Sequence, residues 1–112
     1  MPPADLDLLR GTLDLMVLKT LSWGPMHGLA VLRWIERATH DRLQIEEGAL
    51  YPALHRMEQR GWLEATWGYT EKNRKAKFYR LTPRGRRQLT DELSKWSRYT
   101  EAMNLLLAAS AA

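Results

Sequence analysis

A change in the spacing of apolar residues at Gly61 constrains the fold of this chain more than any other feature of its sequence. Before Gly61, residues 46–60 (EEGALYPALHRMEQR) place Leu50, Leu54 and Met57 four and three residues apart, which predicts a helix with one buried face. After Gly61, apolar and polar residues alternate, which predicts strands. The chain must therefore combine helices with a small β-structure.

The opposite face of the 46–60 helix is small near its start and then polar or basic. It carries Gly48, Pro52, His55, Arg56 and Gln59. Such a face can approach a charged surface closely. The alternative is an ordinary amphipathic helix whose polar face is simply exposed to solvent. Gly61 suits the position directly after a helix, where a left-handed backbone conformation is favoured. Pro52 lies beyond the first turn and should kink the helix or loosen its opening.

Two aromatic-rich segments follow, at residues 62–67 and 76–81. Their alternating pattern predicts a β-hairpin. The connection GYTEKNRK is polar and basic, and Gly68 and Asn73 within it can adopt positive φ. From Lys72 to Arg87 the sequence contains eight basic residues and no acidic one. We therefore expect a positively charged tip, with a merely solvated basic surface as the alternative.

Two helices are predicted before this region and one after it. The first spans residues 8–21 and is apolar on more than one side, residues 22–25 end it, and the second spans residues 28–39. In the second helix we expect Leu29, Leu32 and Ile35 to face inward, with Val31 and Ala38 beside them. Thr82 and Pro83 then suit the N-cap and first position of a helix that reaches Ala108.

The last helix has apolar residues at alternating steps of four and three, which is typical of a helix that pairs with another helix. Its stripe consists of Leu89, Leu93, Trp96, Thr100, Met103 and Leu107. A domain of 112 residues has no obvious surface of its own to cover this stripe. We therefore expect a homodimer whose interface includes Leu89, Leu93, Trp96, Met103 and Leu107.

Composition limits the possible functions. The net charge of +4 and the pI near 9.7 favour a polyanionic partner. The chain has no cysteine, no apolar run long enough to span a bilayer and no signal-peptide pattern, so we expect a cytoplasmic protein without a membrane partner. Its three histidines share no metal-ligand spacing, and no serine lies in a catalytic motif. We expect neither an enzyme nor a cofactor.

The order of elements predicts a mainly α fold with a small β-hairpin: a winged helix-turn-helix followed by a long C-terminal dimerisation helix. The DNA-binding domain would span residues 1–82, with the wing at about 62–81, and the dimerisation helix residues 83–112. In such a fold the third helix enters the major groove of double-stranded DNA. The residues expected to contact DNA are Tyr51, Pro52, His55, Arg56, Gln59, Arg74, Lys75 and Lys77.

The segments LLRGTLDLMVLKTL (8–21), GPMHG (24–28), GALYPALHRMEQRGWL (48–63), Trp67-Gly68 and FYRLTPRGRRQL (78–89) resemble the PadR family of bacterial transcriptional regulators, in its short form with a single C-terminal helix. The resemblance implies a homodimeric winged helix that represses by binding operators and is often released by a small molecule. It also implies that Tyr51 lies on the recognition helix. Two features depart from the family pattern: Glu46 replaces a capping Ser or Asn, and the wing tip is not glycine-rich.

The tryptophans raise a further question about ligands. Trp62 and Trp67 are expected to pack within the hairpin. Trp96 lies in the middle of the dimer stripe, where a planar aromatic ligand could stack between two indoles, a mode that resembles drug-binding members of the family. Trp96, Met103, Leu9 and Leu13 would line such a site. The alternative is that Trp96 simply fills the interface.

Three functions remain open at this point. The first is a repressor released by a small aromatic ligand. The second is a DNA-binding regulator without small-molecule input. The third is a winged helix used only as a protein-interaction module, against which the basic tract argues.

Overall fold

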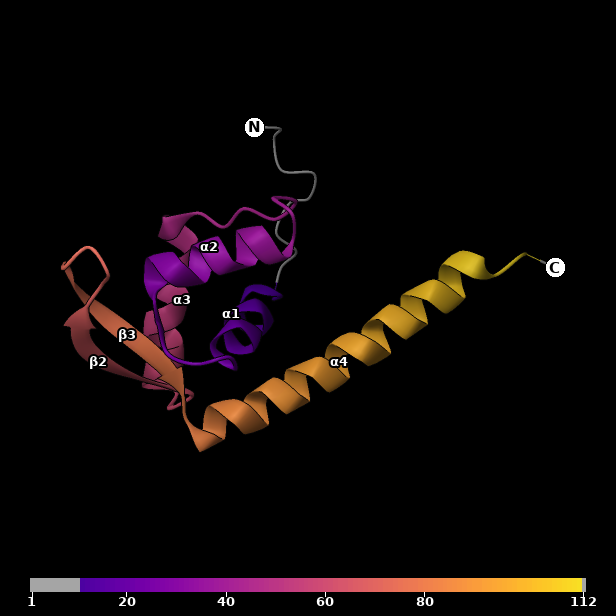
Figure 1. The fold of residues 1–112 in the computed structure, drawn as a ribbon. Helices are drawn as coiled ribbons and strands as arrows, with labels where there is room; N and C mark the ends of the chain where they lie inside the picture. Colours follow the sequence, from indigo (N-terminus) through magenta and orange to yellow (C-terminus); the bar gives the residue numbers. More distant parts are fainter. Residues whose placement is uncertain (1–10, 112) are drawn as a thin grey trace.

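The computed structural model describes residues 11–111 (Figure 1). The elements in this part of the chain are α1 (Leu13–Leu21), β1 (Met26–His27), α2 (Gly28–Ala38), α3 (Glu47–Gln59), β2 (Leu63–Tyr69), β3 (Lys75–Leu81) and α4 (Pro83–Ala108). The strands form one antiparallel sheet in the order β1-β3-β2. The expected fold class, mainly helical with a small β-structure, is confirmed.

The hydrophobic core lies where α1, α2 and α3 meet the base of the sheet. Leu50, Leu54 and Met57 are completely buried on α3, as the helical spacing predicted. On α2, Leu32 and Ile35 are buried as predicted, but Leu29 is 36% exposed and Val31, expected beside the inward face, is completely buried. The buried face of α2 is thus rotated toward Val31, Leu32 and Ile35, because α2 packs against both α1 and α3.

The first helix is shorter than the sequence indicated. We expected it from residue 8, but α1 begins at Leu13 with Thr12 as its N-cap. Gly11 has a φ of 84°, in the left-handed region, so a right-handed helix cannot continue through it. Residues 1–10, including Leu9, lie outside the described residues.

The third strand, β1, was not predicted. Met26 and His27 pair with Tyr79 and Phe78 of β3, so the sheet has three strands rather than two. The His27 side chain then accepts a hydrogen bond from the Ala30 N–H at 3.4 Å and caps the start of α2. Two residues are too few to show an alternating pattern, so the sequence alone gave no signal of this strand.

A compact corner, formed by Gly61, Trp62, Thr82 and Gly85, joins α3, the hairpin and α4. The Thr82 hydroxyl donates to the Gly61 carbonyl at 2.6 Å and accepts from the Gly85 N–H at 3.0 Å. The Thr82 N–H donates to the Trp62 carbonyl at 3.0 Å. Thr82 is therefore the N-cap of α4, as predicted, and it also ties α4 to the end of α3.

From this corner, α4 crosses α1 and then extends away from the rest of the protein (Figure 1). Leu89 packs against the core, but further along the helix Leu93 is 43% exposed, Trp96 39% and Met103 37%. The apolar stripe predicted from the sequence is therefore present and largely uncovered in a single chain.

Gly85→Ala tests the corner. A Cβ at this position would lie 2.1 Å from the Trp62 carbonyl oxygen, which is backbone and cannot turn away. We expect Gly85→Ala to lower the free energy of unfolding by about 3 kcal/mol, near the upper end of overpacking costs, in urea denaturation at fixed protein concentration. Gly48→Ala is the matched control, because its Cβ would meet no atom within 4 Å. Equal stability of the two variants would contradict the corner's role.

Candidate nucleic-acid interface

The exposed face of α3 presents small and polar groups in one row. Leu50, Ala53, Leu54 and Met57 point into the core, and the opposite side exposes Gly48, Pro52, His55 and Gln59. Pro52 lies inside the helix without ending it. Because nothing lies within 4 Å of a Cβ built on Gly48, the start of this face is open to a close approach.

Two ion pairs connect α3 to other elements of the fold, one to α1 and one to β3. On one side, Arg56 Nη2 lies 2.6 Å from Asp14 Oδ1 of α1. On the other side, Glu58 Oε1 lies 3.2 Å from Lys77 Nζ of β3. All four side chains are partly exposed, so each pair adds at most about 1 kcal/mol to stability. Their main effect is to orient Arg56 and Lys77, two residues that the sequence indicated as DNA contacts.

Tyr51 lies at the edge of the exposed α3 face, packed over the start of α2. Its side chain is 43% exposed, and its ring occupies the space that a Cβ on Gly28 would need, since that Cβ would lie 2.5 Å from Cε1. Burial, and secondarily the negative charge of Glu47, raise the pKa of the Tyr51 phenol above its ordinary value. The hydroxyl therefore stays protonated and can donate to a phosphate oxygen.

The turn of the wing is held by its own hydrogen bonds. The Thr70 N–H donates to the Arg74 carbonyl at 2.9 Å, and the Asn73 N–H donates to the Thr70 carbonyl at 2.8 Å. Asn73 has a φ of 59°, as its sequence context indicated, whereas Gly68 is an ordinary strand residue. Asn73 thus takes the place of a turn glycine, and Arg74 and Lys75 are exposed beside it.

The remaining chemistry of the site is sparse. Glu46, the N-cap of α3, makes no side-chain capping hydrogen bond. Within residues 11–111 there is no group of three or more His, Asp or Glu side chains that could hold a metal ion. No helix in that same region is both long and apolar enough to cross a bilayer.

Comparison with known proteins decides the family. The model of the PadR-like family of transcriptional regulators matches residues 17–91, which include the three-stranded sheet, α2, α3 and the start of α4. The chain belongs to this PadR-like family. It is therefore a DNA-binding transcriptional regulator rather than an enzyme.

Solved structures of similar proteins agree. A transcriptional regulator from Clostridium thermocellum is 27% identical, with a TM-score of 0.78 over 85% of this chain and 92% of that one. A PadR-like regulator from Bacillus cereus is 25% identical, with a TM-score of 0.77 over 91% and 97% of the two chains. A PadR family regulator from Eggerthella lenta is 32% identical, with a TM-score of 0.76 over 90% and 86%.

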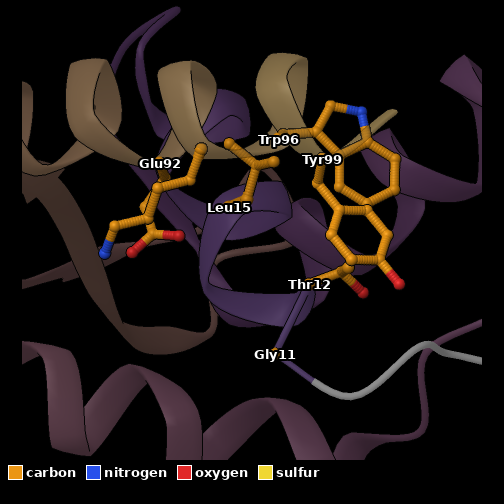
Figure 2. Close-up of a pocket in the computed structure, with 7 residues that line it drawn as sticks. Gly11, Thr12, Leu15, Glu92, Trp96 and Tyr99 are labelled. Carbon is orange, nitrogen blue, oxygen red and sulfur yellow. The ribbon is translucent and has the colours of Figure 1, made fainter. Parts of the chain in front are cut away.

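This PadR-like chain also has a pocket of about 440 Å³ between α1 and α4 (Figure 2). Its lining consists of Gly11, Thr12, Leu15, Glu92, Lys95, Trp96 and Tyr99. The Trp96 and Tyr99 rings stack with centroids 6.3 Å apart. Of the residues that the sequence suggested, Trp96 lines the pocket, Leu13 packs against the core, Met103 is not in the lining and Leu9 lies outside the described residues.

Sequence reasoning missed several residues of these two sites. Leu15 and Tyr99 line the pocket, and Gly28 makes room for Tyr51. Tyr99 follows Trp96 by three residues, so helical spacing could have placed the two rings together. The contact between Gly28 and Tyr51 joins separate helices and has no signal in local sequence.

Gly28→Ala tests how Tyr51 is positioned. The added methyl group should push the Tyr51 ring out of place and weaken binding to a selected DNA duplex by about 1 kcal/mol, the typical value of one hydrogen bond. In a Tyr51→Ala background, Gly28→Ala should cost nothing further, because the ring is already gone. Fluorescence anisotropy measures both losses, and simple additivity of the two changes would contradict the packing argument.

Proposed function

We propose that this PadR-like regulator is a homodimeric repressor released by a planar aromatic ligand. In the proposed complex, α3 and the wing of each protomer bind one half of an operator. The observation that carries the proposal is the uncovered apolar stripe of α4, which continues past the pocket beside Trp96. A dimer bound over two adjacent half-sites would exclude a polymerase from the same DNA.

The proposed dimer interface follows the exposed stripe of α4. Leu93, Trp96, Met103 and Leu107 remain exposed in a single chain, whereas Leu89 is already packed against the core of its own protomer. The interface would therefore begin near Leu93 rather than at Leu89. Pairing two such helices removes these side chains from water, which is the main driving force for association.

We assign contacts with the base edges to residues at the centre of the exposed α3 face. His55 and Gln59 can donate and accept hydrogen bonds there, and Pro52 adds an apolar contact. Arg56 is oriented by Asp14 at the flank, and Tyr51 suits a phosphate on the opposite flank. On the wing, Arg74, Lys75 and Lys77 would neutralise phosphates, which supplies affinity without sequence selection.

Ligand release would act through α1. Thr12 and Leu15 line the pocket, and Asp14 between them binds Arg56 of α3. A ligand stacked on Trp96 and Tyr99 would therefore press on a helix that is directly bonded to the recognition helix. The lining carries one carboxylate, Glu92, and one ammonium, Lys95, so stacking on the two rings rather than net charge would select the ligand. Release requires only that the ligand prefer the DNA-free arrangement by about 1–3 kcal/mol.

The second candidate function is regulation without any small molecule. In that case the Trp96 and Tyr99 rings would be covered by the partner protomer and would serve only as interface packing. Their exposure in the single chain supports this alternative.

Substitutions on α3 and on the wing should affect DNA binding in different ways. Gln59→Ala should weaken binding to selected duplexes by about 1–3 kcal/mol and leave non-specific binding nearly unchanged. Arg74→Ala and Lys75→Ala should weaken both and reduce the slope of log affinity against log salt by about one each. Arg98→Ala, an exposed arginine on α4, controls for net charge. The assignment fails if the wing changes alter base preference and Gln59→Ala does not.

Ligand binding can be tested by titrating cationic planar dyes such as ethidium without DNA. Binding in the pocket should quench tryptophan fluorescence in the native protein, and Trp96→Ala should abolish that quenching because half of the stacking surface is lost. Trp23→Ala is the control, since Trp23 stacks on Trp34 outside the pocket. Undiminished quenching in Trp96→Ala would place the dye elsewhere, and no quenching in any variant would favour the ligand-free alternative.

A further inference from the structure

The wing exposes two large aromatic side chains to solvent. Trp67 is 64% exposed and Tyr69 is 67% exposed, although the sequence indicated that Trp67 would pack within the hairpin. That expectation is wrong because the core does not extend this far along β2. Leu63, at the start of the strand, is buried, whereas Trp67 is not. Exposed aromatic groups next to charged ones are typical of binding surfaces rather than of solvated strands.

The two rings share one face of the hairpin with two lysines. The register pairs Trp67 with Lys77 and Tyr69 with Lys75, and side chains of directly paired residues lie on the same face. The Lys75 ammonium lies 5.2 Å from the centroid of the Trp67 ring. We call Trp67, Tyr69, Lys75 and Lys77 the wing-tip cluster.

Two features connect the wing-tip cluster to DNA rather than to a protein partner. Residues 70–77 contain four basic side chains and one acidic side chain, Glu71, so the tip is strongly positive. The ion pair between Lys77 and Glu58 joins the cluster directly to α3. A duplex bound along the exposed face of α3 would therefore pass the cluster as well.

The chemistry of the cluster suits the minor groove. A flat apolar ring can pack against the deoxyribose walls of the groove, and the indole N–H can donate to adenine N3 or thymine O2 on its floor. The groove is narrowest and most negative in A·T-rich DNA, which favours both the ring and the neighbouring ammonium groups. The hydrogen-bonded turn at Thr70–Arg74 fixes the tip beforehand, so little ordering is needed on binding.

We propose that the wing-tip cluster is a second specificity element, in which Trp67 enters the minor groove beside the site of α3 and selects A·T-rich flanks. This proposal rests on the proposed placement of α3 in the major groove. It adds sequence selection to a wing that would otherwise contribute only phosphate contacts.

The test compares two tryptophans that differ mainly in location. Trp67 and Trp23 are 64% and 65% exposed, and each lies 5.2 Å from a lysine ammonium. Duplexes are selected by the native protein from a random pool, and their flanks are then rewritten as A·T or G·C with the half-sites unchanged. Native protein and Trp23→Ala should both prefer the A·T flank. Trp67→Ala should lose about tenfold in affinity on that flank and retain its affinity on the G·C flank, whereas Trp67→Phe should keep part of the preference.

Two results would overturn the proposal. Retention of the full A·T preference by Trp67→Ala would exclude a reading role. An equal loss of affinity on both flanks would reduce Trp67 to a general contact. Thermal unfolding of each variant separates these results from loss of the fold. Base changes within the half-sites, measured with native protein and with Gln59→Ala, test the placement of α3 independently of the flanks. Failure of the major-groove assignment is therefore distinguishable from failure of the proposed role of the wing-tip cluster.

Discussion

The hydroxyl of Thr82 determines how the functional parts of this protein are placed relative to one another. It bonds the Gly61 carbonyl at the end of α3 and the Gly85 N–H in the first turn of α4. Trp62 lies between the end of α3 and the start of β2, and its carbonyl accepts a hydrogen bond from the Thr82 N–H. The hairpin, α3 and α4 therefore meet at one small hydrogen-bonded corner.

Local patterns predicted the elements that this corner joins. The buried face of α3 followed from apolar residues at helical spacing, and the start of α4 followed from Thr82 and Pro83, whose capping roles depend on adjacent residues alone. The stripe on α4 was predicted in the same way. DNA binding was inferred from the order of elements together with the basic tract, and membership of the PadR-like family supports it.

What the sequence could not supply depends on where the core ends and which elements meet. Alternation along β2 placed Trp67 on the same face as Leu63 and Ala65 but did not show that the core reaches these two residues and stops before Trp67. The Arg56–Asp14 pair joins residues 42 positions apart, and it orients a side chain that a helical wheel places on the solvent side. The pocket likewise needs α1 and α4 to cross at Leu15, a contact set by tertiary packing.

We propose that paired α4 helices hold two α3 helices at the spacing of one DNA turn. The chain has no cysteine, so Gln59→Cys carries a single spin label per protomer at the centre of the exposed α3 face. Because Gln59 is itself assigned to base reading, the measurement uses the protein without DNA or ligand. Electron–electron dipolar spectroscopy of this dimer should give one narrow distance distribution near ~34 Å, the separation of successive major grooves on one side of the duplex. Absence of dipolar coupling, or a broad distribution centred far from that separation, would contradict the account.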